Sequence, residues 1–464
     1  MTPARLAAYR VLRAVSAGDD LPHALARVRD SLADDRDRAL VTEITTGVLR
    51  WQAALDHLIA RIAGRPTSRL DAEVLTVLRV GAYQLRHLER VPSAAAVNES
   101  VTLVRRIGKT SAAGLVNAVL RRIAAAEPGE HLPPEPGPDA AREARLAYLS
   151  VTCSHPLWLV ERWLDRLGFS RTLDWVRFNP RPPALTLRAN RVRTTRRDLA
   201  ALLATHDVRT AETRFAADGL TVLSGNPLRT PLADQGLFLV QDEASQLVAE
   251  LTAVSPGETV LDVCAAPGGK TTAIAAALGA SGRLVASDLR PARVQLLRRT
   301  LARAGAGAVP VIRLDLRQPL PLRAVFDCVL VDAPCSGLGV VRRDPEIRWR
   351  REPADLARFA REQRTMMHHA AAAVRPGGRL VYATCSSEPE ENEQVIAAFL
   401  ADHDDFAPIG RPELAAALPG RLEAVLDDEG RLATRPDAHG LEVFFGAVLR
   451  RRGPVTVVTG RGDL

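Results

Sequence analysis

The chain has 464 residues, of which 47% are hydrophobic and 25% charged, a composition typical of a globular protein rather than a disordered one. This length predicts two or three domains. The net charge of +8 favours a polyanionic partner such as a nucleic acid, although an arginine-rich composition alone gives the same balance. We find neither a membrane-length apolar segment nor a signal-like apolar core near the N-terminus. We therefore expect a cytoplasmic protein with no membrane partner.

The residues from 1 to 127 carry apolar side chains at helical spacing, which predicts a compact helical bundle. Residues 128–235 begin with a proline-rich linker and continue with a helical segment and a small α+β module. In that module, residues 184–190 alternate like a strand and residues 195–203 have a helical pattern. The arginine-rich run from Arg188 to Arg197 either lines an RNA groove or forms a solvated basic face.

Strands and helices alternate between residues 236 and 453, which predicts a doubly wound α/β domain. The strands are expected at residues 259–264, 283–288, 309–315, 326–332 and 379–385, with helices at 291–304 and 356–374. We predict that residues 454–464 form a disordered tail. In open sheets of this kind, the loops after the carboxyl ends of the strands build the ligand site.

A glycine-rich loop joins the first of these strands to a helix expected from Thr271. Its sequence, Asp-Val-Cys-Ala-Ala-Pro-Gly-Gly-Lys-Thr-Thr, runs from Asp262 to Thr272. Glycines let the backbone approach a ligand, and the helix N-terminus adds a positive dipole. The loop matches neither the dinucleotide fingerprint nor the triphosphate-binding pattern, so a nucleoside triphosphate is disfavoured. A tight turn without a ligand is the simpler alternative.

Asp288, Asp315 and Asp332 are each the last residue of a different expected strand of this domain. An acid in such a position commonly binds ribose hydroxyls, and Asp315 is placed to accept a hydrogen bond from an adenine amino group. One such acid could be a solvated surface residue. Three on successive strands, next to the glycine-rich loop, predict a cleft for an adenosyl ligand.

Five cysteines are present, at positions 153, 264, 328, 335 and 385. Their wide spacing offers no zinc-ligand pattern and no disulfide framework, so we expect no metal and a reducing compartment. Cys335 and Cys385 each end an apolar strand and precede small residues, which suggests a nucleophile and a helper. Cys264 and Cys328 lie inside strand runs and fit a core position.

A thiolate is suited to attack at an electron-poor ring carbon such as C6 of a pyrimidine, after which C5 can accept an electrophilic methyl group. The base must be single-stranded or leave its stack for this reaction. Several arginines follow Cys335, and they could lower the pKa of its thiol or hold RNA phosphates. They are Arg342, Arg343, Arg348, Arg350 and Arg351. The residues alone leave the order of the two thiols open.

The motifs resemble those of the RNA cytosine-5 methyltransferases of the RsmB/Nop/Sun family. The resemblance rests on Cys264-Ala-Ala-Pro-Gly-Gly-Lys270, Asp332-Ala-Pro-Cys-Ser-Gly337 and Ala383-Thr-Cys-Ser386, supported by Val240-Gln-Asp-Glu-Ala-Ser-Gln246, Arg343-Asp-Pro-Glu-Ile-Arg-Trp349 and Glu390-Glu-Asn-Glu393. It covers residues from about 150 to 450. The leading helices resemble the NusB-type RNA-binding fold through Asn98-Glu-Ser-Val101 and Val116-Asn-Ala-Val-Leu-Arg-Arg122. Together these features indicate the RsmB (Sun, Fmu) branch.

The resemblance implies a NusB-like bundle, a small α+β module and a Rossmann-like domain that uses S-adenosylmethionine to methylate a cytosine of bacterial small-subunit ribosomal RNA. It assigns the covalent nucleophile to Cys385 and release of the adduct to Cys335. It also places the cofactor against a set of loop and strand-end residues. These are Cys264, Ala265, Ala266, Pro267, Gly268, Gly269, Lys270, Asp288, Asp315 and Asp332. Asp332 is further expected to contact the target base.

Two other functions fit parts of the same sequence. Transfer RNA could be the substrate, because the chemistry would be identical, and the helical extension is what favours ribosomal RNA. A non-catalytic RNA-binding or ribosome-assembly factor would use the bundle alone, but the complete set of cysteines, acids and loop residues argues against it. RNA, either free or in a ribosomal subparticle, is the expected partner, and the protein is expected to be a monomer.

Overall fold

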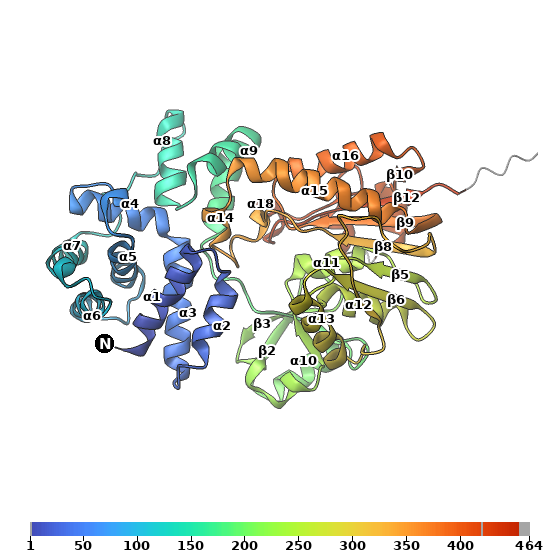
Figure 1. Cartoon of the computed structure of the whole chain (residues 1–464), viewed down its shortest axis with the longest axis horizontal. Coiled ribbons are helices and arrows are strands. Elements are labelled where there is room, and N and C mark those ends of the chain that lie inside the picture. Colours follow the sequence, from blue (N-terminus) through green and yellow to red (C-terminus); the bar gives the residue numbers. More distant parts are fainter. Residues whose placement is uncertain (1, 419–420, 454–464) are drawn as a thin grey trace, which may run out of the picture. The chain divides into compact units, whose positions relative to one another are not determined.

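The computed structural model describes residues 2–418 and 421–453, so the predicted tail lies outside the described residues. The chain divides into two units, each described here by itself (Figure 1). The helical unit consists of residues up to Pro182 together with Val341–Arg351. The sheet unit consists of Pro183–Val340 and the residues from Glu352 onward.

The helical unit confirms the predicted bundle. Its longer helices are α1 (Pro3–Ser16), α2 (Leu21–Arg29), α3 (Asp35–Arg50), α4 (Gln52–Ala63), α5 (Ala72–His87), α6 (Ser93–Arg106), α7 (Ala113–Ala125), α8 (Arg142–Ala147) and α9 (Leu157–Phe178), which is interrupted at Gly168. The apolar faces of α1–α7 meet in one core that includes Ile44, Leu78 and Leu120. Burial of these faces stabilises the bundle far more than helix propensity does.

A short segment from the middle of the sequence completes this unit. Val341–Arg351 contains the single-turn helix α14 (Ile347–Arg350). The indole nitrogen of Trp349 donates to the Leu49 carbonyl oxygen at 2.7 Å, and its ring packs on the bundle core. Arg348 is fully buried and donates to the Ser154 carbonyl oxygen at 3.3 Å. The helical unit therefore needs residues that follow Cys335 in the chain.

The sheet unit begins with a small α+β module, as predicted. Its strands are β1 (Thr186–Ala189), β2 (Arg209–Glu212), β3 (Gly219–Ser224) and β4 (Phe238–Val240), and its helix is α10 (Arg196–Ala204). The strands form an antiparallel sheet in the order β2-β3-β1-β4. β4 therefore belongs to the small module, although it lies inside the range predicted for the larger domain.

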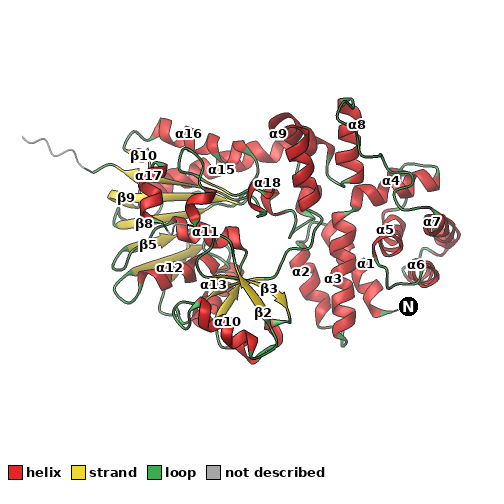
Figure 2. Ribbon diagram, turned by 180° about the vertical axis from the view of Figure 1, so that it is seen from behind, coloured by secondary structure: helices red, strands yellow, loops and turns green. Residues whose placement is uncertain are grey.

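The larger sheet has the doubly wound topology expected from the sequence (Figure 2). Its strands are β5 (Thr259–Asp262), β6 (Arg283–Asp288), β7 (Val311–Arg313), β8 (Phe326–Asp332), β9 (Val374–Thr384), β10 (Phe406–Pro408), β11 (Leu432–Ala433) and β12 (Phe445–Arg451). They follow the order β10-β12-β9-β8-β5-β6-β7, with β11 beside β12. The strands β5 to β9 are parallel, and the antiparallel β10, β11 and β12 extend the sheet beyond the predicted strands.

Helices cover both faces of this sheet. They are α11 (Glu243–Leu251), α12 (Gly269–Leu278), α13 (Pro291–Ala304), α15 (Pro353–Ala371), α16 (Glu393–Asp402), α17 (Arg411–Ala417) and the short α18 (Pro436–His439). One core packs α11, α12 and α17 on the sheet, and a second core packs α15 and α16 on the opposite face. None of the described helices has the length and apolarity required to cross a lipid bilayer.

The structure corrects one predicted boundary near the site. Helix α12 begins at Gly269, two residues before the expected start at Thr271. Gly268 has a φ of +106°, in the left-handed region, and ends the turn that leads out of β5. The helix can start directly after it because the first turn of a helix needs no intrahelical acceptor for its N–H groups.

Candidate active site

The two cysteines singled out in the sequence lie side by side at one edge of the larger sheet. β8 and β9 are parallel neighbours whose register pairs Asp332 with Ala383, so the chain leaves both strands at the same level. Cys335 follows the first strand and Cys385 the second. Their Sγ atoms are 3.3 Å apart and both side chains are partly buried. Two thiols separated by fifty positions in sequence can therefore act on the same part of a substrate.

A buried glutamate holds the two cysteine loops together. Glu391 is completely buried, and one of its carboxylate oxygens accepts from the Ser336 N–H at 2.7 Å. The other accepts from the Ser386 hydroxyl at 2.5 Å, and the two serine hydroxyls are 3.2 Å apart. Gln363 of α15 donates to the same carboxylate at 3.0 Å. The serine after each cysteine thus donates a hydrogen bond to Glu391, Ser336 through its N–H and Ser386 through its hydroxyl.

Lys270, from the first turn of α12, interacts electrostatically with Cys385. Its ammonium donates to the Asp332 carboxylate at 2.6 Å. Burial disfavours the charge on Lys270, but attraction to Asp332 and to a thiolate at Cys385 more than offsets this effect, and the pKa of Lys270 is raised. The lysine and the aspartate therefore form a charged pair beside Cys385.

Three of the five arginines that could provide this positive field, or hold RNA phosphates, are engaged within the helical unit. Arg342 donates to the carbonyl oxygens of Arg181 and Pro182, and Arg348 to that of Ser154. Arg350 forms an ion pair with Asp20 at 2.9 Å. Proximity in sequence to Cys335 was misleading because the chain passes into another core directly after the cysteine loop.

The protonation of Cys335 differs from that of an ordinary thiol. Its hydrogen bond with Cys385 and its burial raise the pKa of Cys335 well above the usual value. The thiol of Cys335 therefore keeps its proton while it faces Cys385. Burial also raises the pKa of Cys328 to about 12 and that of Cys264 further. Cys328 is a core residue, as expected, and Cys264 packs at the edge of the core behind the glycine-rich loop.

The glycine-rich loop has unsatisfied polar groups suited to a ligand. Asp262 is buried at the end of β5, where one carboxylate oxygen accepts from the Thr271 hydroxyl at 2.8 Å. Its other oxygen has no hydrogen-bond partner among the described residues. Burial raises the pKa of Asp262 to about 7. A buried acceptor of this kind normally has a partner, so a donor group of a bound molecule fits here.

The strand-end acids surround the same loop. Asp288 accepts from the Ala266 N–H at 3.3 Å and from the Arg293 guanidinium at 3.1 Å. The Leu314 N–H donates to the Asp288 carbonyl oxygen at 3.3 Å, so Asp315 begins at the same edge. The carboxylate of Asp315 is held by Arg317 at 2.8 Å, and this bond lowers the pKa of Asp315. The loop and these strand ends thus lie at one edge of the larger sheet.

Two side chains outside the predicted set fix the start of α12. Arg188 of β1 is buried and donates to the Gln241 amide oxygen at 2.7 Å and to the Thr272 hydroxyl at 2.6 Å. It also donates to the Gly269 carbonyl oxygen. Burial lowers the pKa of Arg188 to about 10. Arg188 therefore belongs neither to a groove nor to a solvated face. Gln241 lies in the motif Val240–Gln246, but the sequence did not assign it a role.

Among the described residues, no group of three or more His, Cys, Asp and Glu side chains could hold a metal ion. The site consists of two thiols, a lysine–aspartate pair and a glycine-rich loop beside the buried Asp262 oxygen that has no hydrogen-bond partner within the described chain. This set can bind a cationic, hydrogen-bonding ligand and add a sulfur nucleophile to an electrophilic carbon.

Three family models match the chain in order. The NusB family matches residues 2–125, the ferredoxin-like domain of RsmF/B-like methyltransferases matches residues 155–229, and 16S rRNA methyltransferase RsmB/F matches residues 249–450. The first range corresponds to the bundle and the third to most of the larger sheet. The second range runs from α9 of the helical unit through β3 of the small module. The predicted domain boundaries themselves stay predictions.

Relatives of similar length share this arrangement. The chain is 34% identical to the probable ribosomal RNA small subunit methyltransferase B of Bacillus subtilis, over 92% of this chain and 93% of that protein. It is 36% identical to ribosomal RNA small subunit methyltransferase B of Pseudomonas putida, over 86% and 88% of the two chains. The crystal structure of the protein PH0851 superposes with a TM-score of 0.79 at 26% identity, covering 97% of this chain and 99% of that one.

Proposed function

Since the chain belongs to the 16S rRNA methyltransferase RsmB/F family, we propose that it methylates C5 of one cytosine in 16S ribosomal RNA. The family is one of enzymes that depend on S-adenosylmethionine. The observation that carries the cytosine-C5 assignment is the 3.3 Å separation of the Cys335 and Cys385 sulfurs beside the Lys270–Asp332 pair. An attacking thiolate and a neighbouring thiol are the groups that addition and elimination at a pyrimidine ring require.

S-adenosylmethionine fits the glycine-rich loop and would supply an electrophilic methyl group when bound. The unpartnered oxygen of Asp262 would accept a hydrogen bond from the ammonium group of the ligand, because a buried acceptor needs a donor. The backbone from Cys264 to Lys270 would enclose the ligand, with the N-terminus of α12 beside it. Asp288 and Asp315 would bind its ribose and adenine.

Cys385 would be the nucleophile. Its thiolate adds to C6 of the cytosine, and the electron pair of the C5–C6 double bond makes C5 nucleophilic. Lys270 supports this role because its ammonium attracts a negative charge on Cys385. Asp332, held by Lys270 at 2.6 Å, would be positioned to bind the base.

Cys335 would act when the adduct breaks down. After C5 has gained the methyl group, a base takes the C5 proton, the C5–C6 double bond re-forms and the C6–S bond breaks. The Cys335 thiol retains its proton because its pKa is raised. It can therefore donate a hydrogen bond to the departing thiolate, whose sulfur lies 3.3 Å away.

The helical unit would contribute RNA binding. It matches the NusB family, and α6 and α7 pack against each other. Exposed cations lie on both helices at Arg105, Arg106, Arg121 and Arg122. A group of exposed arginines is suited to bind phosphates.

A covalent trap separates the two cysteines. RNA that contains 5-azacytidine should form a stable adduct with the wild-type protein and S-adenosylmethionine, detected as a shifted band on a denaturing gel. Cys385→Ala should form none. Cys335→Ala, with ordinary RNA, should accumulate an adduct that the wild-type protein releases.

A retained covalent complex in Cys385→Ala would contradict the assignment of the nucleophile. Cys328→Ala is the matched control, because Cys328 is a core cysteine of the same sheet and should leave adduct formation intact. Absence of any adduct with the wild-type protein would contradict covalent catalysis altogether.

A further inference from the structure

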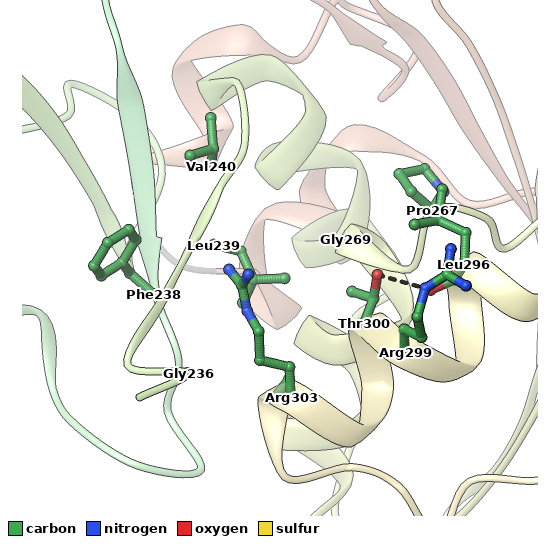
Figure 3. Close-up of a pocket in the computed structure, with 11 residues that line it drawn as sticks. Gly236, Phe238, Leu239, Val240, Pro267, Gly269, Leu296, Arg299, Thr300 and Arg303 are labelled. Atoms are coloured by element: carbon green, nitrogen blue, oxygen red, sulfur yellow. Dashed lines mark hydrogen bonds between the residues drawn. The ribbon is translucent and has the colours of Figure 1, made fainter. Parts of the chain in front are cut away.

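A groove in the sheet unit adjoins the glycine-rich loop and extends away from the two cysteines' strands (Figure 3). It separates β4 of the small module from α13 of the larger sheet and has a volume of about 520 Å³. Leu239 and Val240 line one wall, and Leu296 lines the other. Val240 is 51% exposed and Leu296 40% exposed, which is unusual for side chains of this size.

The two walls are held at a fixed spacing by a buried asparagine. The Asn190 side-chain amide donates to the Gly236 carbonyl oxygen at 2.7 Å and to the Ala304 carbonyl oxygen at 2.8 Å. Gly236 approaches the end of α13 so closely that a Cβ there would lie 2.1 Å from the Arg303 carbonyl oxygen. The groove is therefore a built feature of the fold and not a gap between mobile parts.

Unpaired cations line the groove. Arg299 and Arg303 extend from adjacent turns of α13 into the space between that helix and β4 (Figure 3). Arg193 lines a second hollow that continues from Arg303, and Asp234 also lines it. No ion pair joins these three arginines to an acid within residues 2–418 and 421–453, and all three are exposed. Among the described residues the groove is lined by two arginines and no acid, and the adjoining hollow adds Arg193 and Asp234, so the two together carry a positive charge.

One end of the groove reaches the cofactor loop. Pro267 and Gly269 line it, and Gly269 directly precedes Lys270, whose ammonium binds Asp332. An RNA strand in the groove would thus lie beside the glycine-rich loop that carries Lys270. The base must be single-stranded or leave its stack for attack at C6, and single-stranded RNA exposes bases and riboses on both sides of the target.

We propose that this groove, formed by β4 and α13, binds the single-stranded RNA that flanks the target cytosine. Arg193, Arg299 and Arg303 would bind its phosphates, since a guanidinium pairs well with a phosphate. Leu239, Val240 and Leu296 would cover the apolar faces of the riboses and bases. The proposal rests on RNA being the substrate, as proposed above.

The full-length variant Arg299→Gln/Arg303→Gln tests the proposal. Equilibrium binding of a fluorescein-labelled 16S rRNA fragment, followed by fluorescence anisotropy, should weaken by about tenfold, as expected for loss of charged hydrogen bonds. The slope of log K against log salt should fall by about 1 for each arginine. The KM for RNA in methyl transfer should rise, while the affinity for S-adenosylmethionine stays unchanged.

Arg298→Gln is the matched control. Arg298 lies on the same helix, but its guanidinium donates to the Val311 carbonyl oxygen at 3.1 Å and does not line the groove. This variant should bind RNA like the wild type. Equal RNA affinity and equal salt slope in the double variant and the wild type would overturn the groove proposal. Failure of the wild-type protein to methylate RNA would instead count against the proposed function, and the binding arm would still decide the groove.

Discussion

The neighbours of Cys335 and Cys385 differ, although the sequence leaves the two thiols equivalent. Cys335 keeps its proton because its hydrogen bond with Cys385 and its burial raise its pKa. Lys270 lies where it attracts negative charge on Cys385. Both effects favour Cys385 as the attacking sulfur. This physical argument agrees with the role that the family resemblance implies, and the adduct trap decides it.

Buried carboxyls make the stability of the protein depend on pH. Burial raises the pKa of Glu250 from 4.5 to about 7. Between these values the folded chain holds a proton that the unfolded chain has released, so the free energy of unfolding falls as pH rises. The slope contributed by one such group is at most about 1.4 kcal/mol per pH unit. Thermal unfolding between pH 5 and 8 should therefore show a smaller decrease for Glu250→Gln than for the wild type.

Asp404→Asn is the control for this measurement, because Asp404 is exposed in the same unit. Its unfolding should follow the wild-type pH dependence. A Glu250→Gln profile parallel to that of the wild type would show that Glu250 titrates normally in the folded protein.

At the scale of elements, the site depends on how the loops after β8 and β9 are joined. Glu391 accepts hydrogen bonds from Ser336, Ser386 and Gln363, which come from three different segments. Glu391→Gln keeps the shape but replaces one acceptor oxygen by a donor. We expect a loss of about 1.5–3 kcal/mol in the free energy of unfolding, as for a hydrogen bond to a charged group. Activity should fall with it, because the sulfurs would no longer be held at their observed separation.

Denaturant unfolding and a methyl-transfer assay check this prediction. Glu393→Gln serves as the control, since Glu393 is exposed at the start of α16 and close to Glu391 in sequence. If Glu391→Gln kept both wild-type stability and wild-type activity, Glu391 would not be the group that holds the cysteine loops.

The same elements show how far the sequence alone can predict the site. The cysteines, Asp288 and Asp332 are visible because each follows a recognisable apolar strand, and parallel strands bring their ends to one edge. Glu391 lies in the Glu390–Glu393 motif, but its role is not visible in the sequence, because it meets Ser336 across fifty-five positions. Arg188 donates to the Gly269 carbonyl oxygen from a separate sheet. Its burial sets it apart from the other arginines of the run, and burial is not visible in the sequence.

At the scale of the whole molecule, the chain path links the two units. Val341–Arg351 leaves the cysteine loop of the sheet unit and is embedded in the helical unit. Because the segment follows Cys335, its arginines could have acted on the thiol or held RNA phosphates, whereas Arg348 and Trp349 contact the helical unit. The predicted bundle is confirmed, but it is completed by residues from more than two hundred positions later in the chain.

Trp349→Ala tests this completion of the helical unit. Trp349 packs partly buried on the bundle core and donates to the Leu49 carbonyl oxygen at 2.7 Å. Its truncation should cost about 2 kcal/mol of stability, below the cost for a fully buried tryptophan. Trp349→Phe should lose less, because it keeps most of the ring contact. Thermal unfolding that is identical for the wild type and Trp349→Ala would contradict the packing described here.

Bisulfite sequencing of 16S ribosomal RNA tests the central claim most directly. RNA from a strain that lacks the gene should lose the protection of one cytosine, and the wild-type gene should restore it. The gene carrying Cys385→Ala should not restore it. An unchanged 16S profile in the deletion strain would contradict the account, and loss of 5-methylcytosine from transfer RNA instead would assign the same chemistry to a different substrate.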